Sequence, residues 1–113
     1  MRGSSKSDAG PKGSARLFAA LGDETRLRIV SRLCAHGPQS ITSLTAGSKV
    51  TRQAVTKHLH VMMGSGLVRS TRRGRETVWQ LEPHPLADAR RYLDMISRQW
   101  DDALLRLKDF VET

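Results

Sequence analysis

Residues 50–81, VTRQAVTKHLHVMMGSGLVRSTRRGRETVWQL, decide the fold of this chain. Their first part predicts a helix from about Thr51 to residue 65, because Thr51 can cap it and Val55, Leu59 and Met62 recur at helical spacing. We expect this apolar side to pack on a core. The opposite side carries long polar side chains, so it is expected to face solvent or a partner.

The second part of the same stretch predicts a β-hairpin. Segments 67–71 and 77–81 are rich in apolar and β-branched residues, which favour strands. Between them lies Arg72-Arg73-Gly74-Arg75-Glu76, a glycine-bearing turn that carries three arginines. A polar-faced helix followed by a basic hairpin is therefore the central feature of the sequence.

Three further helices are predicted upstream. Ser14 is expected to cap the first, which ends at Gly22, and Asp23 to cap the second, which ends near His36. Ser40 is expected to cap a third, short helix. The second helix is expected to bury a stripe formed by Leu27, Ile29, Val30, Leu33 and Cys34.

The last helix is predicted to run from about residue 86 to 111, and its apolar residues are separated by alternating gaps of three and four. These residues are Leu86, Ala89, Leu93, Ile96, Trp100, Ala103, Leu107 and Phe110, with Tyr92, Met95, Leu104 and Leu105 beside them. Such a helix is about 39 Å long, which is more than a domain this small can cover. The pattern therefore favours pairing of two chains along this helix.

Taken together, these elements predict a mainly helical winged helix-turn-helix: four helices, a small β-hairpin and the long last helix, in that order. The length of 113 residues allows one domain. We expect residues 14–113 to form it. Residues 1–13 are rich in Gly, Ser and Lys and are expected to be a flexible basic tail.

The positive charge is concentrated in the central stretch. The chain carries 19 Lys and Arg against 11 Asp and Glu, a formal net charge of +8. Residues 49–80 hold only one acidic residue, Glu76, and seven basic residues: Lys49, Arg52, Lys57, Arg69, Arg72, Arg73 and Arg75. A basic patch on one part of a small domain is typical of proteins that bind a polyanion.

Double-stranded DNA is the partner that this arrangement favours. A helix fits the major groove, where Arg52 or Lys57 could bind guanine and Gln53 could bind adenine. Thr51 and Thr56 can reach phosphate or a thymine methyl group, and His60 can reach phosphate. Arg72, Arg73 and Arg75 at the hairpin tip suit an adjacent phosphate strand or the minor groove.

The sequence also resembles a known family. LGDETRLR, residues 21–28, resembles the LADPTRLR-type opening of ArsR-family bacterial repressors, residues 50–68 resemble the family's recognition-helix signature, and RRGRETVWQL resembles its wing. The resemblance covers residues 15–82, and residues 99–110 resemble a subgroup with a long last helix. It implies a homodimeric repressor that binds an operator. Two recognition helices about 34 Å apart would meet successive major grooves, so we expect that operator to be palindromic. The implied dimer contacts are Leu17 and Phe18 in the first helix and Leu93, Ile96, Trp100, Leu104 and Leu107 in the last.

Metal sensing is not expected. Metal-sensing members of the family carry a Cys-x-Cys type motif in the helix before the turn, where this chain has Ile-Thr-Ser-Leu at 41–44. The spaced histidines that other members use on the last helix are also missing beside Asp88. Zinc needs about four such ligands, so we expect no metal and no cofactor. The effector stays open between an organic ligand, a partner protein and none.

Composition excludes several other classes. No apolar run approaches the roughly 18 residues of a membrane helix, so no membrane partner is expected. The N-terminus lacks the apolar segment of a secretory signal, and a single cysteine fits a reducing cytosol, which favours a cytoplasmic protein. We see no catalytic constellation, so an enzyme is not expected. An RNA-binding domain usually offers exposed aromatic side chains, and only 4% of the residues here are aromatic, so RNA is not favoured. A winged-helix module that binds protein stays the main alternative.

Four single residues have competing interpretations. His58 is expected to pack or hydrogen-bond at the edge of the buried face, whereas His60 is more exposed. Trp79 is expected to anchor its strand in the core. Cys34 is expected to be a small buried hydrophobe, although a redox role stays open.

Overall fold

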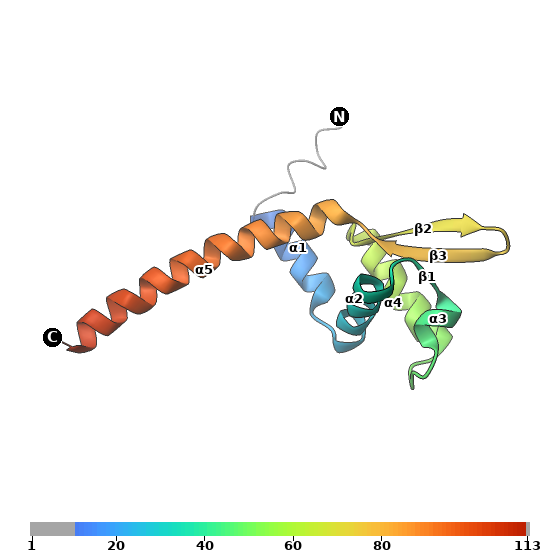
Figure 1. Cartoon of the computed structure of the whole chain (residues 1–113), viewed down its shortest axis with the longest axis horizontal. Helices are drawn as coiled ribbons and strands as arrows, with labels where there is room; N and C mark the ends of the chain where they lie inside the picture. The colour runs from blue at the N-terminus through green and yellow to red at the C-terminus, as the bar shows by residue number, and fades with distance from the viewer. Residues whose placement is uncertain (1–10, 113) are drawn as a thin grey trace, which may run out of the picture.

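The computed structural model describes residues 11–112 and contains five α-helices and three β-strands within that range (Figure 1). They are α1 (Pro11–Leu21), α2 (Glu24–His36), β1 (Gln39–Ser40), α3 (Ile41–Thr45), α4 (Arg52–Gly64), β2 (Val68–Arg73), β3 (Glu76–Leu81) and α5 (Pro83–Glu112). The predicted fold class is confirmed. The chain is a mainly helical winged helix-turn-helix with an antiparallel wing and a long C-terminal helix.

The β-sheet has one strand more than the sequence predicted. The hairpin of β2 and β3 is joined by β1 in the order β1-β3-β2, and every neighbouring pair is antiparallel. Gln39 pairs with Trp79, and Ser40 pairs with Val78. A two-residue strand is too short to show the alternating pattern by which strands are recognised in a sequence.

The core is built on the apolar side of α4. Val55, Leu59 and Met62 are buried as predicted, and Leu59 and Met62 have no exposed surface. They pack in one cluster with residues from the other helices and from the wing: Leu17, Ala20, Ile29, Leu33, Leu44, Leu67, Val68, Trp79 and Ala89. Trp79 is 3% exposed and anchors β3, as expected. This packing fixes which side of α4 faces outward.

Side-chain caps begin three of the helices, as predicted. Asp23 accepts a hydrogen bond from the Arg26 amide at 3.1 Å, and Ser40 accepts one from the Ser43 amide at 3.2 Å. Thr51 caps α4 by accepting from the Ala54 amide at 3.1 Å. Each cap satisfies an amide that the first helical turn leaves without a partner. The caps therefore fix where α2, α3 and α4 begin.

The first helix begins earlier than predicted. Helix α1 starts at Pro11, and proline suits a first helical turn because its missing N–H would have no partner there. Ser14 is therefore not a cap: it lies inside the helix and is 3% exposed. Residues 11–13 of the predicted tail are helical, and residues 1–10 of that tail lie outside the described range.

The buried stripe of α2 is narrower than predicted. Ile29 and Leu33 are buried, but Leu27 is 50% exposed and Cys34 is also exposed. The neighbours α1, α4 and β3 pack on the side of α2 that is centred on Ile29 and Leu33. Leu27 and Cys34 lie roughly 100° or more around the helix from that centre. The expectation that they are buried is therefore wrong.

Helix α5 extends far beyond the rest of the molecule (Figure 1). Its first turns pack on α1, where the centroids of the Tyr92 and Phe18 rings lie 6.5 Å apart. Within α5, only Ala89 is buried. The radius of gyration is 17.9 Å, whereas a compact chain of this length has about 13 Å. A single chain therefore leaves most of α5 uncovered.

The predicted dimer residues differ in how far one chain exposes them. Leu93, Trp100 and Leu107 on α5 are at least half exposed within one chain, and Leu104 is 48% exposed. Ile96 and Phe18 are half-buried. Leu17 is 4% exposed, because it packs into the core of its own chain. Leu17 is therefore a core residue of its own chain, and its contact with a second chain stays a prediction.

Candidate nucleic-acid interface

The outward side of α4 presents polar side chains opposite the buried stripe. Arg52, Gln53, Lys57 and His60 are exposed, and Thr56 is half-buried. The Gln53 and Lys57 side chains have no hydrogen-bond or ion-pair partner within residues 11–112. Long polar groups without internal partners are available to bind base edges in a major groove.

Two of the α4 side chains also form internal contacts. The Arg52 guanidinium donates to the Thr42 hydroxyl on α3 at 2.8 Å, and the Thr56 hydroxyl donates to the Arg52 carbonyl at 2.8 Å. The Thr56 proton is thus engaged by the helix itself, so its methyl group and oxygen lone pairs remain for a ligand. Arg52 is held against α3 before any partner arrives.

The wing is attached to α4 by an aromatic contact. The His60 ring meets Trp79 of β3 edge to face, with centroids 5.7 Å apart and planes at 88°. Ser70 of β2 lies against Met63 of α4, its hydroxyl 4.0 Å from the sulfur. These contacts join the wing to α4, with His60 at the junction.

The tip of the wing is tighter than predicted. Strands β2 and β3 continue to Arg73 and Glu76, so the turn contains only Gly74 and Arg75. Gly74 has φ +62°, the conformation that the first position of this hairpin turn requires and that glycine adopts without strain. The Arg72 guanidinium donates to the Gly74 carbonyl at 3.2 Å. Arg72, Arg73 and Arg75 are all exposed, so the tip presents three cations to solvent.

Comparison with known proteins gives the family. A family model described as a helix-turn-helix domain matches residues 21–71. The chain is 39% identical to the HTH-type transcriptional regulator Rv2034 of Mycobacterium tuberculosis, over 87% of this chain and 88% of that protein. It is 38% identical to the solved structure of an ArsR-like transcriptional regulator from Rhodococcus, with a TM-score of 0.70 over 87% and 92% of the two chains. The chain belongs to the ArsR family of helix-turn-helix transcriptional regulators. The family is one of DNA-binding regulators and not of enzymes.

One further match is in sequence and another is in fold. The chain is 32% identical to the arsenical resistance operon repressor of Escherichia coli, over 70% of this chain and 68% of that protein. A homodimeric winged helix-turn-helix DNA-binding domain from Mycobacterium bovis has the same fold, with a TM-score of 0.59 and 22% identity over 81% and 82% of the two chains.

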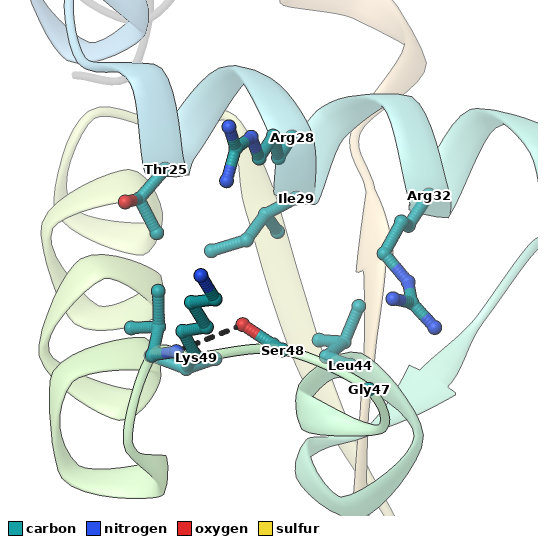
Figure 2. Close-up of a pocket in the computed structure, with 10 residues that line it drawn as sticks. Thr25, Arg28, Ile29, Arg32, Leu44, Gly47, Ser48 and Lys49 are labelled. Carbon is teal, nitrogen blue, oxygen red and sulfur yellow. Dashed lines mark hydrogen bonds between the residues drawn. The ribbon is translucent and has the colours of Figure 1, made fainter.

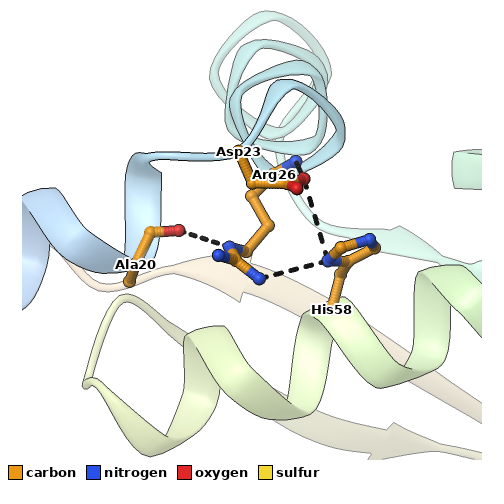
Figure 3. Close-up of polar contacts among 4 residues, drawn as sticks. All are labelled: Ala20, Asp23, Arg26 and His58. Carbon is orange, nitrogen blue, oxygen red and sulfur yellow. Dashed lines mark hydrogen bonds and ion pairs between the residues drawn. The ribbon is translucent and has the colours of Figure 1, made fainter.

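Behind the candidate interface, the ArsR-family chain holds α4 against α2 with a small polar cluster (Figure 3). Nε of Arg26 donates to the Ala20 carbonyl, and Nη1 of Arg26 lies 3.3 Å from Nδ1 of His58. The same ring nitrogen lies 3.9 Å from the Asp23 carboxylate. His58 is thus bound inside the protein, as expected.

The cluster perturbs the acidity of Asp23. The hydrogen bond from the Arg26 amide holds the pKa of Asp23 below its ordinary 3.8, and the charges of His58 and Arg26 act in the same direction, against partial desolvation. The ionised carboxylate is thereby favoured at the start of α2. It also suits the positive end of the helix dipole there.

Three polar residues near the interface were not in the predicted set. Thr42 on α3 contacts Arg52, and Lys49 is exposed in the turn before α4. Arg69 on β2 lies 3.7 Å from the Glu82 carboxylate. Lys49 and Arg69 belong to the basic stretch that charge indicated, although no DNA contact was assigned to them, whereas nothing in the sequence pairs Thr42 with Arg52.

Neither a metal cluster nor a membrane helix is found in the described range. Among residues 11–112, no three His, Cys, Asp or Glu side chains lie close enough to share a metal ion. None of the helices in that range is both long and apolar enough to cross a membrane.

Proposed function

We propose that this protein is a homodimeric repressor that binds a palindromic operator through α4 and the wing. The observation that carries the proposal is the outward side of α4, where Gln53 and Lys57 have no partner within residues 11–112, together with the three exposed arginines at the wing tip. The helix is of the right size for a major groove, and the tip is suited to the neighbouring phosphates. We assign base contacts to Arg52, Gln53, Lys57 and the Thr56 methyl group.

The remaining polar residues are assigned to the phosphate backbone. Thr51 accepts a bond as the α4 cap, so its hydroxyl proton remains for a phosphate oxygen. Arg72, Arg73 and Arg75 supply charge that is independent of base sequence. His60 is assigned a phosphate contact through its free edge, because its ring is already packed on Trp79.

The proposed dimer rests on the uncovered apolar residues of α5. Trp100 is 64% exposed and Leu107 is 58% exposed, at the heptad-like spacing of a helix that pairs with another. Two chains paired along α5, with Phe18 beside it, would bury this surface, and the Mycobacterium bovis fold relative is described as homodimeric. Recognition helices about 34 Å apart would then meet successive major grooves, which requires a palindromic site.

Repression is proposed because the Escherichia coli relative is an operon repressor. We also propose that DNA binding needs no metal ion, so this chain falls outside the metal-sensing members of the family. Residues 41–44, Ile-Thr-Ser-Leu, support this because they offer no thiol ligand on α3. Duplex affinity should therefore be unchanged when a chelator is added. We expect the protein to act in the cytoplasm.

Selection of bound fragments from random double-stranded DNA tests the proposal. We expect an enriched sequence with two inverted half-sites whose centres lie about one helical turn apart. Binding to it, measured by fluorescence anisotropy, should weaken steeply with salt. Arg52→Ala and Lys57→Ala should each relax base preference at defined positions, with a loss of about 1 to 3 kcal/mol of discrimination.

The control for these variants is Arg90→Ala, which removes an exposed cation from α5 away from α4 and the wing. It should leave base preference unchanged. Recovery of no enriched sequence, or duplex binding that does not respond to salt, would contradict the proposal and favour a winged-helix module that binds protein. A single half-site without inverted symmetry would contradict the dimer.

A further inference from the structure

A second candidate site lies behind the recognition helix. A cavity of about 490 Å³ opens between α2 and the turn that joins α3 to α4 (Figure 2). It is lined by Thr25, Arg28, Ile29, Arg32, Leu44, Gly47, Ser48, Lys49, Val50 and Val55. This volume lies within the range of small-molecule sites, about 300 to 1,000 Å³.

The lining combines an apolar base with basic groups. Ile29, Leu44 and Val55 are each at most 4% exposed and form the apolar part. Arg28, Arg32 and Lys49 supply three cations, and no acidic side chain is among the lining residues. The exposed Glu24 pairs with Arg28 from outside that set. A cavity with this lining favours a ligand that has both an apolar part and a negative charge.

Two of the cations have donors to spare. The Lys49 side chain extends into the cavity toward α2 (Figure 2), and it has no ion-pair partner within residues 11–112. Arg32 donates to the Ser43 carbonyl at 3.0 Å and to the Ala46 carbonyl at 3.4 Å. Its Nε is buried and has no hydrogen-bond partner in the structure. Because Nε is enclosed, a ligand in the cavity would meet the outer nitrogens of Arg32, beside the carbonyls that they already contact.

We propose that this cavity binds a small organic carboxylate, with its apolar part against Ile29, Leu44 and Val55 and its charge at Lys49. Ser48 can add a donor, because its oxygen accepts from the Val50 amide at 3.0 Å and its proton is not used in that bond. A free carboxylate fits better than a DNA phosphate. Val55 lies on the buried side of α4, about 160° around the helix from Lys57, so DNA on the outward side would not cover this wall.

The cavity is positioned to affect recognition. Lys49 stands two residues before Thr51, the cap at which α4 begins. A ligand that binds Lys49 in this extended position restrains the turn before that cap, so the carboxylate and the operator are thermodynamically linked through the same turn. This coupling rests on the proposed DNA binding, whereas binding of the carboxylate does not.

Benzoate titrated into the ¹⁵N-labelled full chain, with benzamide as its uncharged counterpart, tests the site. We expect benzoate to shift the amide signals of Gly47, Ser48 and Lys49 in a saturable way, and benzamide to leave them unchanged. Lys49→Gln should weaken benzoate binding about tenfold or more. Lys57→Gln removes the same charge from the outward side of α4 and should leave benzoate binding intact.

Equal weakening in Lys49→Gln and Lys57→Gln, or equal binding of benzamide, would overturn the proposal. The amide spectrum also shows whether each variant is folded. Lys49→Arg, which keeps the charge, should retain binding, and failure of this rescue in a folded variant also counts against the site.

A second arm adds the selected duplex to the benzoate complex. Simultaneous binding, with a changed duplex affinity, supports a free carboxylate coupled to the operator. Displacement of benzoate by duplex, with a reduced salt dependence in Lys49→Gln alone, would instead identify the cavity as a seat for a DNA phosphate. Absence of duplex binding would contradict the proposed function and leave the benzoate result standing.

Discussion

Asp23 joins the start of α2 to the back of α4 with a single side chain. Its carboxylate caps α2 and lies near His58 on α4. Because the hydrogen bond from the Arg26 amide lowers the pKa of Asp23 in the folded chain, ionised Asp23 stabilises the fold. This stabilisation is fully present above the unfolded-state pKa and is lost as pH falls through the folded-state value.

Asp23→Asn therefore isolates the charge, since asparagine caps helices about as well as aspartate. We expect the wild-type chain to be more stable than this variant at pH 6. The difference should hold down to about pH 4 and shrink below it. Urea denaturation from pH 6 to pH 3, at one fixed chain concentration, measures it.

Glu24→Gln serves as the matched control, because it removes a carboxylate from the same helical turn. Its pairing with Arg28 is at the surface, where an ion pair contributes little. A stability difference for Asp23→Asn that does not change between pH 6 and pH 3 would contradict the role of the charge.

Several residue-level features followed from the sequence because they are local. Caps at Asp23, Ser40 and Thr51 depend on the next few amides, and the α4 stripe depends on helical spacing alone. Leu27 and Cys34 were misplaced because which side of α2 is covered depends on helices distant in the sequence. The contact of Arg26 with His58 is also long-range, so only the placement of His58 at the edge of the buried face was foreseen.

At the scale of elements, the wing tip concentrates cations without adding base contacts. Arg72→Ala combined with Arg73→Ala should weaken duplex binding at every sequence alike, because phosphates are common to all DNA. The slope of log affinity against log salt should become shallower by about 0.9 for each phosphate that is no longer neutralised, or roughly two in all. Anisotropy titrations between 50 and 200 mM salt, a range in which such slopes are resolved, provide the measurement.

The control for charge loss alone is Arg90→Ala combined with Arg98→Ala. Both arginines are exposed on α5, where Arg98 lies opposite the apolar seam and Arg90 lies at its edge. This variant has the same net charge as the wing variant, so an equal change in slope would show that net charge matters and the location of the arginines does not.

The elements themselves were largely predictable, and the exceptions have a physical reason. Hairpin strands with β-branched residues and a glycine turn are strong local signals, and both were found. Strand β1 forms by pairing with Trp79 and Val78, which are distant in the sequence. Its two residues are too few to predict a strand on their own. The basic residues of the candidate interface followed from charge, but the cavity beside Lys49 arises only when α2 packs near the α3–α4 turn.

For the molecule as a whole, the test of assembly is α5. Trp100→Glu combined with Leu107→Glu places charges in the exposed apolar seam, where neither side chain supports the fold of its own chain. We expect sedimentation to show monomers with unchanged helical content by circular dichroism. Operator affinity should fall about 100-fold or more, because two half-sites are no longer bound together.

Asp94→Glu is the control here, since it keeps a carboxylate at an exposed α5 position. It should remain dimeric. A seam variant that still sediments as a dimer would refute pairing along α5, whereas a monomer that keeps full operator affinity would refute the need for two linked half-sites.

The protruding last helix has a quantitative consequence for the cell. Under the proposed pairing, mass action makes the supply of competent repressor scale with the square of chain abundance whenever that abundance is below the dissociation constant of the pair. Halving synthesis would then leave about a quarter of the active species. The concentration of active repressor would thus respond more steeply to gene dosage than that of a protein that acts as a monomer.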